Sequence, residues 1–187
     1  IPQKSGMGGG SMNAASVLDY FTKKKIIKIP IKQVHKIANS VGSDVVLGLK
    51  KKNTVLFTNN SIKRVNFKTK IDVLLVQPNI KYRTKLIYSK VSNYSKQEYT
   101  NKYKTYFTNK NLINSKNDLE RIVINRYPKI KDLKFFISTL LGLIFVRMTG
   151  SGSTIVAYFK SKKDLDIAAT IIKKQYPKYW SIKSKTI

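Results

Sequence analysis

The chain has 187 residues, of which 42% are hydrophobic, so it is long enough to form a packed core as one domain or two small ones. It contains no cysteine, which excludes a disulfide framework and thiolate metal sites. The net charge of +28 comes from 37 basic residues, but only five of these are arginine, the residue favoured for paired hydrogen bonds to bases and phosphates. We therefore expect scattered lysines on solvated surfaces and no specific nucleic-acid partner, with a basic nucleic-acid-binding protein as an alternative.

No stretch of the sequence has the roughly eighteen uninterrupted apolar residues of a membrane-spanning helix. The longest candidate, residues 135–146, is interrupted by Ser138, Thr139 and Gly142. The first residues do not have the pattern of a signal peptide. We expect no membrane segment and a cytoplasmic location.

The first predicted domain covers residues 1–68. Four glycines, at positions 6, 8, 9 and 10, lead into a helix that Ser11 is placed to cap and whose apolar residues keep helical spacing up to Phe21. A second helix is predicted to stop at Gly42. Two strands follow, and the segment Asn59-Asn60-Ser61 between them is typical of a hairpin turn.

The second predicted domain covers residues 69–187. Its expected elements are a buried strand at 73–76, a helix at 84–91, helices at 118–126 and 130–141, strands at 144–148 and 155–159, a helix at 163–174 and a strand near 180–183. This order is typical of an α+β domain of ferredoxin-like type, an antiparallel sheet backed by helices.

Residues 92–112, rich in Lys, Asn, Ser and Tyr, are predicted to form a mobile surface segment. Its tyrosines could stack nucleobases, but we favour a solvated segment with one aromatic side packed inward.

The glycine-rich segment is typical of a phosphate-binding loop, because exposed backbone N–H groups at a helix start can surround phosphate oxygens. It is not a Walker A loop, since Ser11-Met12 stands where Lys-Ser/Thr is required. It is not the dinucleotide fingerprint either, because Ser11 occupies the place of the third glycine. From the residues alone, a flexible connection is an equally good interpretation.

Two other places could carry chemistry, Asp44 and the turn at 149–154. Asp44 precedes the apolar run Val45-Val46-Leu47, so it could accept a proton from a substrate hydroxyl, but from the residues alone we favour Ser43-Asp44 as a simple helix cap. The turn at 149–154 could bring a second glycine-rich backbone against the first loop, or be a hairpin turn only. The single histidine, His35, is expected to be a surface or packing residue, and no metal-ligand cluster is predicted.

Together these segments resemble the GHMP small-molecule kinases. Residues 2–15 resemble the motif in which that family wraps the phosphates of ATP, and Gly42-Ser43-Asp44-Val45 resembles its catalytic-aspartate segment. Residues 78–84 resemble a substrate-side loop. The segments 117–120, 127–128 and 147–153 resemble the C-terminal half of the branch that acts on a diphosphocytidyl sugar alcohol.

The resemblance implies a GHMP kinase fold. Residues 1–68 would be the C-terminal part of the ATP-binding domain, a partial domain like domain 2 of ribosomal protein S5. Residues 69–187 would be the ferredoxin-like C-terminal domain. The resemblance also implies that ATP and Mg²⁺ are used.

The resemblance assigns roles to individual residues. Asp44 would be the catalytic base or the anchor for the attacking hydroxyl, and Thr84 would lie beside the substrate. The residues holding the ATP phosphates would be Pro2, Gly6, Gly8, Gly9, Gly10 and Ser11. No residue would bind the metal directly, but the Ser11 hydroxyl would lie near Mg²⁺. Gly150, Ser151 and Gly152 would support the phosphate loop.

The activity implied by the resemblance is transfer of the ATP γ-phosphate to the 2-hydroxyl of 4-diphosphocytidyl-2-C-methyl-D-erythritol, in the non-mevalonate isoprenoid pathway, by a monomer or homodimer. Another GHMP small-molecule kinase is the alternative. The family's earlier segments do not occur here, so we expect a C-terminal fragment of about two thirds of the protein that is inactive alone. Met12 and Val46 stand where the family usually has serine and proline.

Overall fold

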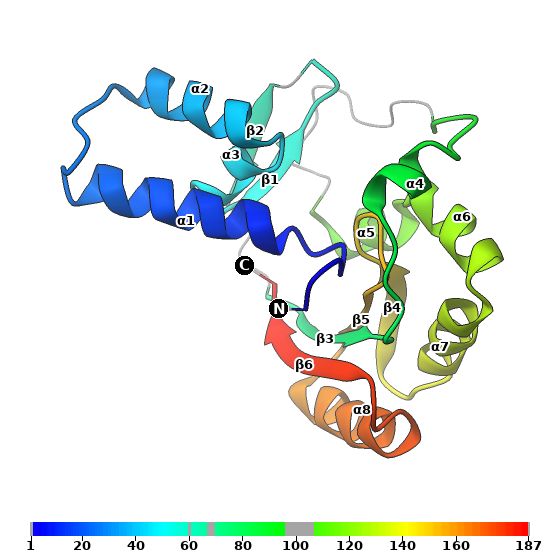
Figure 1. Ribbon diagram of the computed structural model, residues 1–187. Helices are drawn as coiled ribbons and strands as arrows, with labels where there is room; N and C mark the ends of the chain where they lie inside the picture. The colour runs from blue at the N-terminus through cyan, green and yellow to red at the C-terminus, as the bar shows by residue number, and fades with distance from the viewer. Residues whose placement is uncertain (1, 60, 67–69, 96–106, 187) are drawn as a thin grey trace. The chain divides into compact units, whose positions relative to one another are not determined.

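The computed structural model describes residues 2–59, 61–66, 70–95 and 107–186, and it divides into two compact units (Figure 1). The smaller unit is Gly8–Asn66, and the larger unit combines Ile1–Met7 with Phe67–Ile187. The division thus lies close to the predicted boundary at residue 68, but the first seven residues are grouped with the C-terminal part of the chain. Within the described ranges, none of the helices combines the length and the apolar composition that spanning a bilayer requires.

The smaller unit contains three helices and a hairpin, namely α1 (Gly9–Lys23), α2 (Ile31–Val41), α3 (Val45–Gly48), β1 (Asn53–Leu56) and β2 (Ile62–Val65). The two strands are antiparallel, as predicted. Buried small and branched side chains of the three helices form the core: Ala15, Ala38, Val45 and Val46. The Arg64 guanidinium donates to the carbonyl oxygens of Val46 (2.7 Å) and Leu47 (3.3 Å), which ties β2 to α3.

The start of α1 differs from the prediction. The helix begins at Gly9, and Gly8 occupies the N-cap position with φ 65°, three residues before the predicted cap Ser11. This left-handed conformation is one that glycine adopts without steric cost. Ser11 therefore lies inside the first turn, and its predicted role as the helix cap is wrong.

The larger unit contains a four-stranded antiparallel sheet in the order β4-β5-β3-β6. Its elements are β3 (Asp72–Gln77), α4 (Thr84–Tyr88), α5 (Asn109–Asn114), α6 (Asp118–Arg126), α7 (Pro128–Ser138), β4 (Leu143–Met148), β5 (Ile155–Phe159), α8 (Lys162–Gln175) and β6 (Trp180–Lys185). The first strand of the unit, β3, lies between the third and the fourth. This is the ferredoxin-like arrangement that the sequence predicts.

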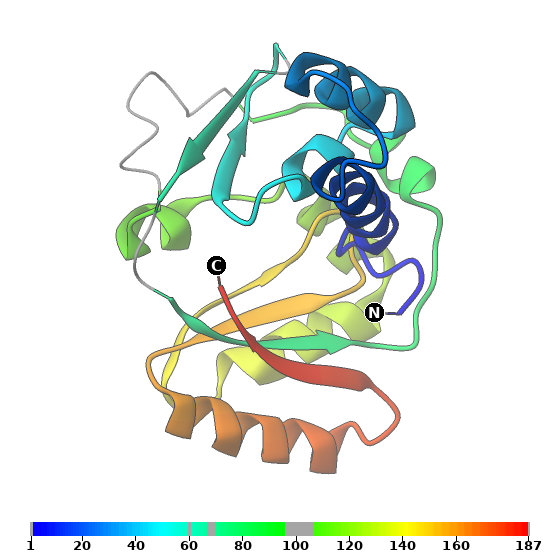
Figure 2. The same cartoon turned by 90° about the vertical axis from the view of Figure 1, so that its left-hand side faces the viewer.

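One core joins the helices to one face of this sheet. Side chains of α6, α7 and α8 pack in a single buried cluster with alternate residues of β3 and β5, among them Leu74 and Ala157. Figure 2 shows α8 lying under the strands. The loop between β4 and β5 therefore projects from the end of a rigid, well-packed element, which suits it to hold functional groups in place.

Part of the segment predicted to be mobile is helical. Thr108 caps the short helix α5, its hydroxyl oxygen accepting a hydrogen bond from the Asn111 backbone N–H (3.3 Å). Most of the tyrosines considered for base stacking (Tyr99, Tyr103 and Tyr106) lie outside the described residues, whereas Tyr94 is described and is 68% exposed.

Candidate functional site

The turn between β4 and β5 is buried and held by its own backbone. Thr149 N–H donates to Thr154 O (3.0 Å), and Gly152 N–H donates to Thr149 O (2.8 Å). Ser151, Ser153 and Thr154 are all buried. The Ser153 hydroxyl donates to Ile80 O (2.8 Å), which fastens the turn to the segment after β3. The turn is therefore a fixed part of the larger unit, and not an exposed hairpin loop.

This turn packs against the first glycine-rich residues of the chain. Thr154 N–H donates to Ser5 O (3.2 Å), and the Thr149 hydroxyl donates to Gly6 O (3.3 Å). A Cβ atom at Gly6 would lie only 2.5 Å from the nitrogen of Gly152, so no larger residue fits without movement of the backbone. The contact between the two glycine-rich segments that the sequence suggested is present in the structure. The supporting role of Gly150, Ser151 and Gly152 in phosphate binding stays a prediction.

Two side chains from the segment after β3 hold the centre of the turn. The Tyr82 hydroxyl donates to Ser151 O (2.9 Å), and the Thr84 and Ser151 hydroxyl oxygens are 3.0 Å apart, a hydrogen bond in which either can donate. Thr84 is exposed, whereas Ser151 is buried. The structure thus brings together two residues that the sequence placed in the site from positions far apart in the chain.

Tyr82 was not predicted as a site residue. Its ring is buried and stacks on Tyr127, with ring centroids 4.6 Å apart. Burial, and to a lesser extent the neighbouring Tyr127, raise the pKa of Tyr82 above the usual value of a phenol. Tyr82 is therefore a neutral hydrogen-bond donor at physiological pH. The only signal in the sequence was its position inside the segment that resembles the substrate-side loop.

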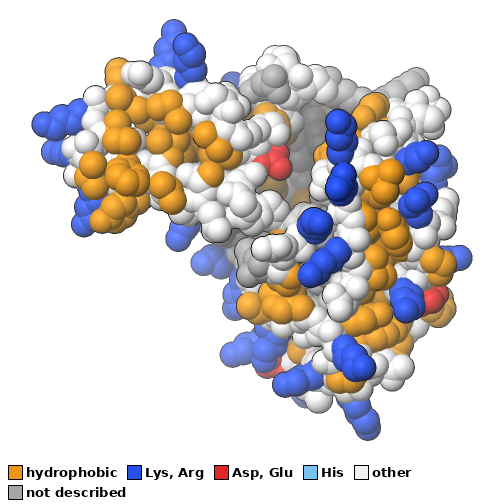
Figure 3. All heavy atoms as spheres, viewed as in Figure 1, with side chains coloured by type: hydrophobic (Ala, Val, Ile, Leu, Met, Phe, Trp, Pro, Cys, Tyr) orange, Lys and Arg blue, Asp and Glu red, His pale blue; other side chains and the backbone are white. Residues whose placement is uncertain are grey.

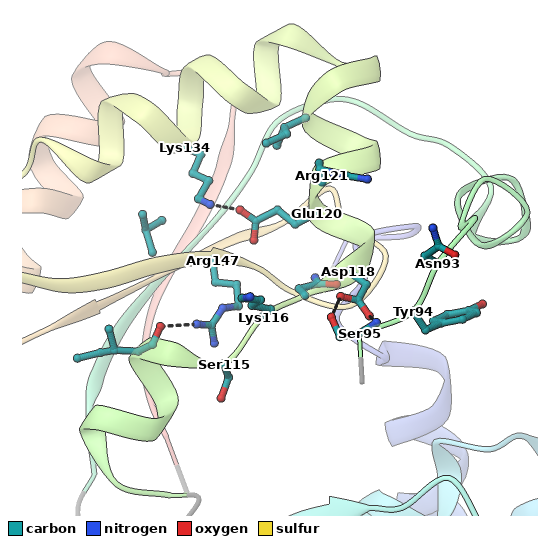
Figure 4. Close-up of a pocket in the computed structure, with 14 residues that line it drawn as sticks. Asn93, Tyr94, Ser95, Ser115, Lys116, Asp118, Glu120, Arg121, Lys134 and Arg147 are labelled. Carbon is teal, nitrogen blue, oxygen red and sulfur yellow. Dashed lines mark hydrogen bonds and ion pairs between the residues drawn. The ribbon is translucent and has the colours of Figure 1, made fainter. Parts of the chain in front are cut away.

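Two side chains at the start of α6, those of the N-cap residue Asn117 and of Glu120 in the first turn, complete the support of the turn. The Asn117 side-chain amide donates to Met148 O (2.9 Å) and Gly150 O (2.8 Å), while its oxygen accepts from Leu119 N–H (3.1 Å). The buried Glu120 carboxylate accepts from Met148 N–H (3.1 Å) and pairs with Lys134 (Figure 4). The spacing Asn-x-x-Glu is that of a capping box, which was the signal available in the sequence.

A cavity of about 730 Å³ lies beside this helix turn (Figure 4). Its carboxylates already have partners, since Asp118 accepts from the backbone and hydroxyl of Ser95, and Glu120 pairs with Lys134. The Arg147 guanidinium donates to the backbone oxygens of Leu112 (2.9 Å) and Ile113 (3.1 Å). These charged groups therefore stabilise the fold around the turn.

The second half of the glycine-rich segment belongs to the smaller unit, where it forms the start of α1. The first backbone N–H groups of an α-helix have no acceptor within the helix, and in the described structure no side chain caps α1. The first turn of α1 also contains no acidic residue. The amides of Gly9, Gly10 and Ser11 are therefore free to meet an anion, and the helix dipole favours negative charge there.

Asp44 lies in the smaller unit at the N-cap position of α3. Asp44 thus occupies the capping position that the sequence suggested, but its exposed carboxylate makes no capping hydrogen bond within the described residues. The Ser43 hydroxyl lies 3.5 Å from its Oδ1 atom. The following Val45 and Val46 are buried, which anchors the backbone behind the carboxylate.

The described part of the chain offers no metal site made by protein alone. It contains no group of three or more His, Asp or Glu side chains that could hold an ion. His35 is partly exposed on α2.

Comparisons with known proteins give a consistent family. Residues 108–178 match the family model described as GHMP kinases C terminal. The chain is 47% identical over 187 residues to the 4-diphosphocytidyl-2-C-methyl-D-erythritol kinase of Pelagibacter ubique, covering 100% of this chain and 66% of the relative. It is 31% identical over 189 residues to the kinase of the same name from the Wolbachia of Brugia malayi, covering 96% of this chain and 63% of the relative.

Solved structures share the fold. A crystal structure of 4-(cytidine 5'-diphospho)-2C-methyl-D-erythritol kinase superposes with a TM-score of 0.74 at 21% identity, covering 98% of this chain and 67% of the other. Homoserine kinase from Cytophaga hutchinsonii superposes with a TM-score of 0.69 at 12% identity, covering 100% of this chain and 67% of the other. The chain therefore spans about two thirds of the length of the proteins it matches.

Proposed function

Because the chain belongs to the GHMP kinases, we propose that the protein transfers the γ-phosphate of ATP to the 2-hydroxyl of 4-diphosphocytidyl-2-C-methyl-D-erythritol, a step of the non-mevalonate route to isoprenoids. The observation that carries this proposal is the 47% identity over all 187 residues with the Pelagibacter enzyme of that name. The fold shared with homoserine kinase does not identify the acceptor, since one fold can serve many substrates.

The phosphates of ATP are proposed to bind at the glycine-rich segment, with contacts from Pro2, Gly6, Gly8, Gly9, Gly10 and Ser11. Phosphoryl transfer depends mainly on positioning and on stabilisation of charge, which backbone amides at a helix start can supply. Gly10 supports this assignment. A Cβ atom at Gly10 would meet no described heavy atom within 4 Å, so packing inside the described structure does not require glycine. Glycine also weakens a helix relative to alanine. A glycine that neither packing nor helix stability favours is expected where a ligand approaches the backbone closely.

Mg²⁺ is proposed to accompany ATP and to neutralise phosphate charge. The residues present fit this ion in the way typical of nucleotide sites, where phosphates and water supply most ligands and the protein supplies few. The Ser11 hydroxyl, partly exposed in the first turn of α1, would lie near the ion.

Asp44 and Thr84 are proposed to act on the acceptor. The Asp44 carboxylate would accept the proton of the 2-hydroxyl, or hold that hydroxyl in line for attack. Its exposure and its lack of a capping hydrogen bond in the described structure leave its oxygens able to do so. Thr84 would contact the acceptor from the larger unit, where Ser151 fixes its hydroxyl.

We also propose that residues 1–68 are the C-terminal part of the ATP-binding domain and that residues 69–187 are the C-terminal domain of the kinase. A cytoplasmic location, a monomer or homodimer, and the absence of a specific nucleic-acid partner complete the proposal. Lys and Arg side chains are dispersed over the face seen in Figure 3, and such dispersion favours weak, salt-sensitive contacts with nucleic acid over a defined binding site.

The test is an acceptor panel with the complete purified protein and ATP, in which release of ADP is followed. We expect turnover with the diphosphocytidyl acceptor and none with homoserine, mevalonate or galactose. A preference for one of the other acceptors would contradict the proposed substrate. Asp44→Asn should reduce kcat by about 10²–10⁴-fold, whereas Asp19→Asn, which removes the same charge in the same unit from an exposed ion pair with Lys23, should leave it unchanged.

A further inference from the structure

The end of β4 has an unusual pair of backbone partners. β4 lies at the edge of the described sheet, so its outward backbone groups have no neighbouring strand to bond. At Met148, which is 1% exposed, both outward groups are nevertheless satisfied by side chains at the start of α6. Its N–H donates to Glu120 Oε2 (3.1 Å), and its carbonyl oxygen accepts from Asn117 Nδ2 (2.9 Å). We call this pair of side chains, Asn117 and Glu120, the Met148 clamp.

Asn117 extends the clamp into the turn itself. Besides Met148 O, its amide donates to Gly150 O (2.8 Å), so one side chain holds the last residue of β4 and the first glycine of the turn. Its oxygen accepts from Leu119 N–H, which fixes the rotamer of the side chain at the start of α6. All hydrogen-bonding positions of the clamp are thus set by a helix that is packed into the core.

Glu120 is a buried carboxylate, 8% exposed, which is costly unless its charge and its lone pairs are satisfied. Lys134 on α7 supplies the opposite charge, and Met148 N–H supplies a hydrogen bond. The buried ion pair therefore does more than balance charge, because one of its oxygens is bonded to the backbone at the end of β4.

We propose that Asn117 and Glu120 are positioning residues for ATP, acting through Met148. The two side chains fix the end of β4 and thereby the turn at 149–154. The turn in its place fixes Gly6 by backbone contact and Thr84 through the Ser151 hydroxyl. This inference rests on the proposed function. Neither side chain needs to touch ATP, since small displacements of positioning groups are enough to slow transfer.

The substitution Asn117→Asp removes the clamp's hydrogen bonds to Met148 and Gly150 while keeping the cap of α6. The aspartate keeps an oxygen that can accept from Leu119 N–H, but it replaces an amide donor by an oxygen facing the two carbonyl oxygens of Met148 and Gly150. Ser161→Ala is the matched control, because Ser161 caps α8 by accepting from Asp164 N–H (3.1 Å) and belongs to neither the clamp nor the turn. Both variants are made in the complete protein and assayed well below their unfolding midpoints.

We expect Asn117→Asp to lower kcat/KM for ATP by about tenfold or more, while Ser161→Ala lowers the unfolding midpoint and leaves kcat/KM unchanged. A pair of substitutions at Glu120 gives a rescue. Glu120→Gln keeps an oxygen for Met148 N–H and should stay near wild type, because Lys134, with 31% of its side chain exposed, can be solvated. Glu120→Ala loses the acceptor and should resemble Asn117→Asp.

The rate of amide hydrogen exchange in residues 149–154 reports how firmly the clamp holds the turn, independently of enzymatic activity. Exchange should accelerate in Asn117→Asp and Glu120→Ala, but not in Ser161→Ala or Glu120→Gln. An unchanged exchange rate in Asn117→Asp would show that the clamp does not hold the turn. A faster rate with an unchanged kcat/KM would show that the clamp does not position groups for ATP. If the wild-type protein transferred no phosphate, the proposed function would be refuted. The exchange rates alone would then test whether the clamp holds the turn.

Discussion

Replacing Gly6 by alanine tests the backbone contact between the two glycine-rich segments of the larger unit. Gly6 has φ +70°, a conformation that costs an L residue about 1–2 kcal/mol. The new Cβ atom would lie 2.5 Å from Gly152 N and 2.6 Å from Thr149 O. Both neighbours are backbone atoms in a buried turn, so the crowding adds about 1–3 kcal/mol. The expected loss is about 2–5 kcal/mol in the free energy of unfolding.

Gly8→Ala is the matched control for this substitution. Gly8 has nearly the same φ, +65°, but a Cβ atom there would meet no described atom within 4 Å. Its expected loss is therefore the conformational part alone, about 1–2 kcal/mol. Thermal unfolding followed by circular dichroism measures both variants, and Gly6→Ala should unfold roughly 3–10 °C below Gly8→Ala. Equal midpoints would refute the close contact at Gly6.

Four further substitutions test other parts of the site. Asp44→Asn should reduce kcat by about 10²–10⁴-fold and change the free energy of unfolding by less than about 0.5 kcal/mol, because its side chain is exposed; a large loss of stability would show a structural role instead. Gly10→Ala should raise the unfolding midpoint slightly, by helix propensity, yet raise KM for ATP about tenfold; an unchanged KM would remove Gly10 from the phosphate site. Thr84→Val should cost about 0.5–1.5 kcal/mol through loss of the hydrogen bond to Ser151 and raise KM for the acceptor; an unchanged KM would remove Thr84 from the acceptor site. Burial raises the pKa of Tyr82, so the folded state favours its neutral form. The stability that the neutral Tyr82 side chain contributes is fully present below the unfolded-state pKa of about 10 and is lost as the pH rises further. In urea unfolding measured at increasing alkaline pH, the free energy of unfolding of Tyr82→Phe should therefore fall less with pH than that of the wild type. An equal fall in both proteins would contradict this.

The order of elements in the larger unit was predictable because local signals agree with the tertiary structure. Asn117 caps α6, and the uncharged run Val73–Val76 lies in the central strand β3. Helix α7 begins at Pro128, two residues before its predicted start, because proline is accepted in the first turn of a helix. The ferredoxin-like sheet follows from the order of strands and helices. The start of α1 was placed wrongly because Ser11 is a strong capping residue, whereas the observed cap is a left-handed glycine that carries no capping side chain.

The site was predictable only in part, since its key contacts join distant segments. Met148 lies 31 residues from Asn117, and Ser151 lies 69 residues from Tyr82, so no local pattern relates them. The turn at 149–154 was predictable as a candidate because two glycines lie close together between two predicted strands. The Asn-x-x-Glu spacing predicts that Glu120 bonds within the first turn of its own helix, whereas its carboxylate bonds to the backbone of β4. The short helix α5 was missed because polar residues dominate its sequence.

The most direct test of the central claim follows the phosphate itself. The complete protein is incubated with [γ-³²P]ATP and 4-diphosphocytidyl-2-C-methyl-D-erythritol, and labelled products are separated and identified. We predict one labelled organic product, phosphorylated at the 2-hydroxyl, formed in equal amount to ADP and lost in Asp44→Asn. Label found only as inorganic phosphate, or a labelled acceptor formed at the wild-type rate by Asp44→Asn, would contradict the account.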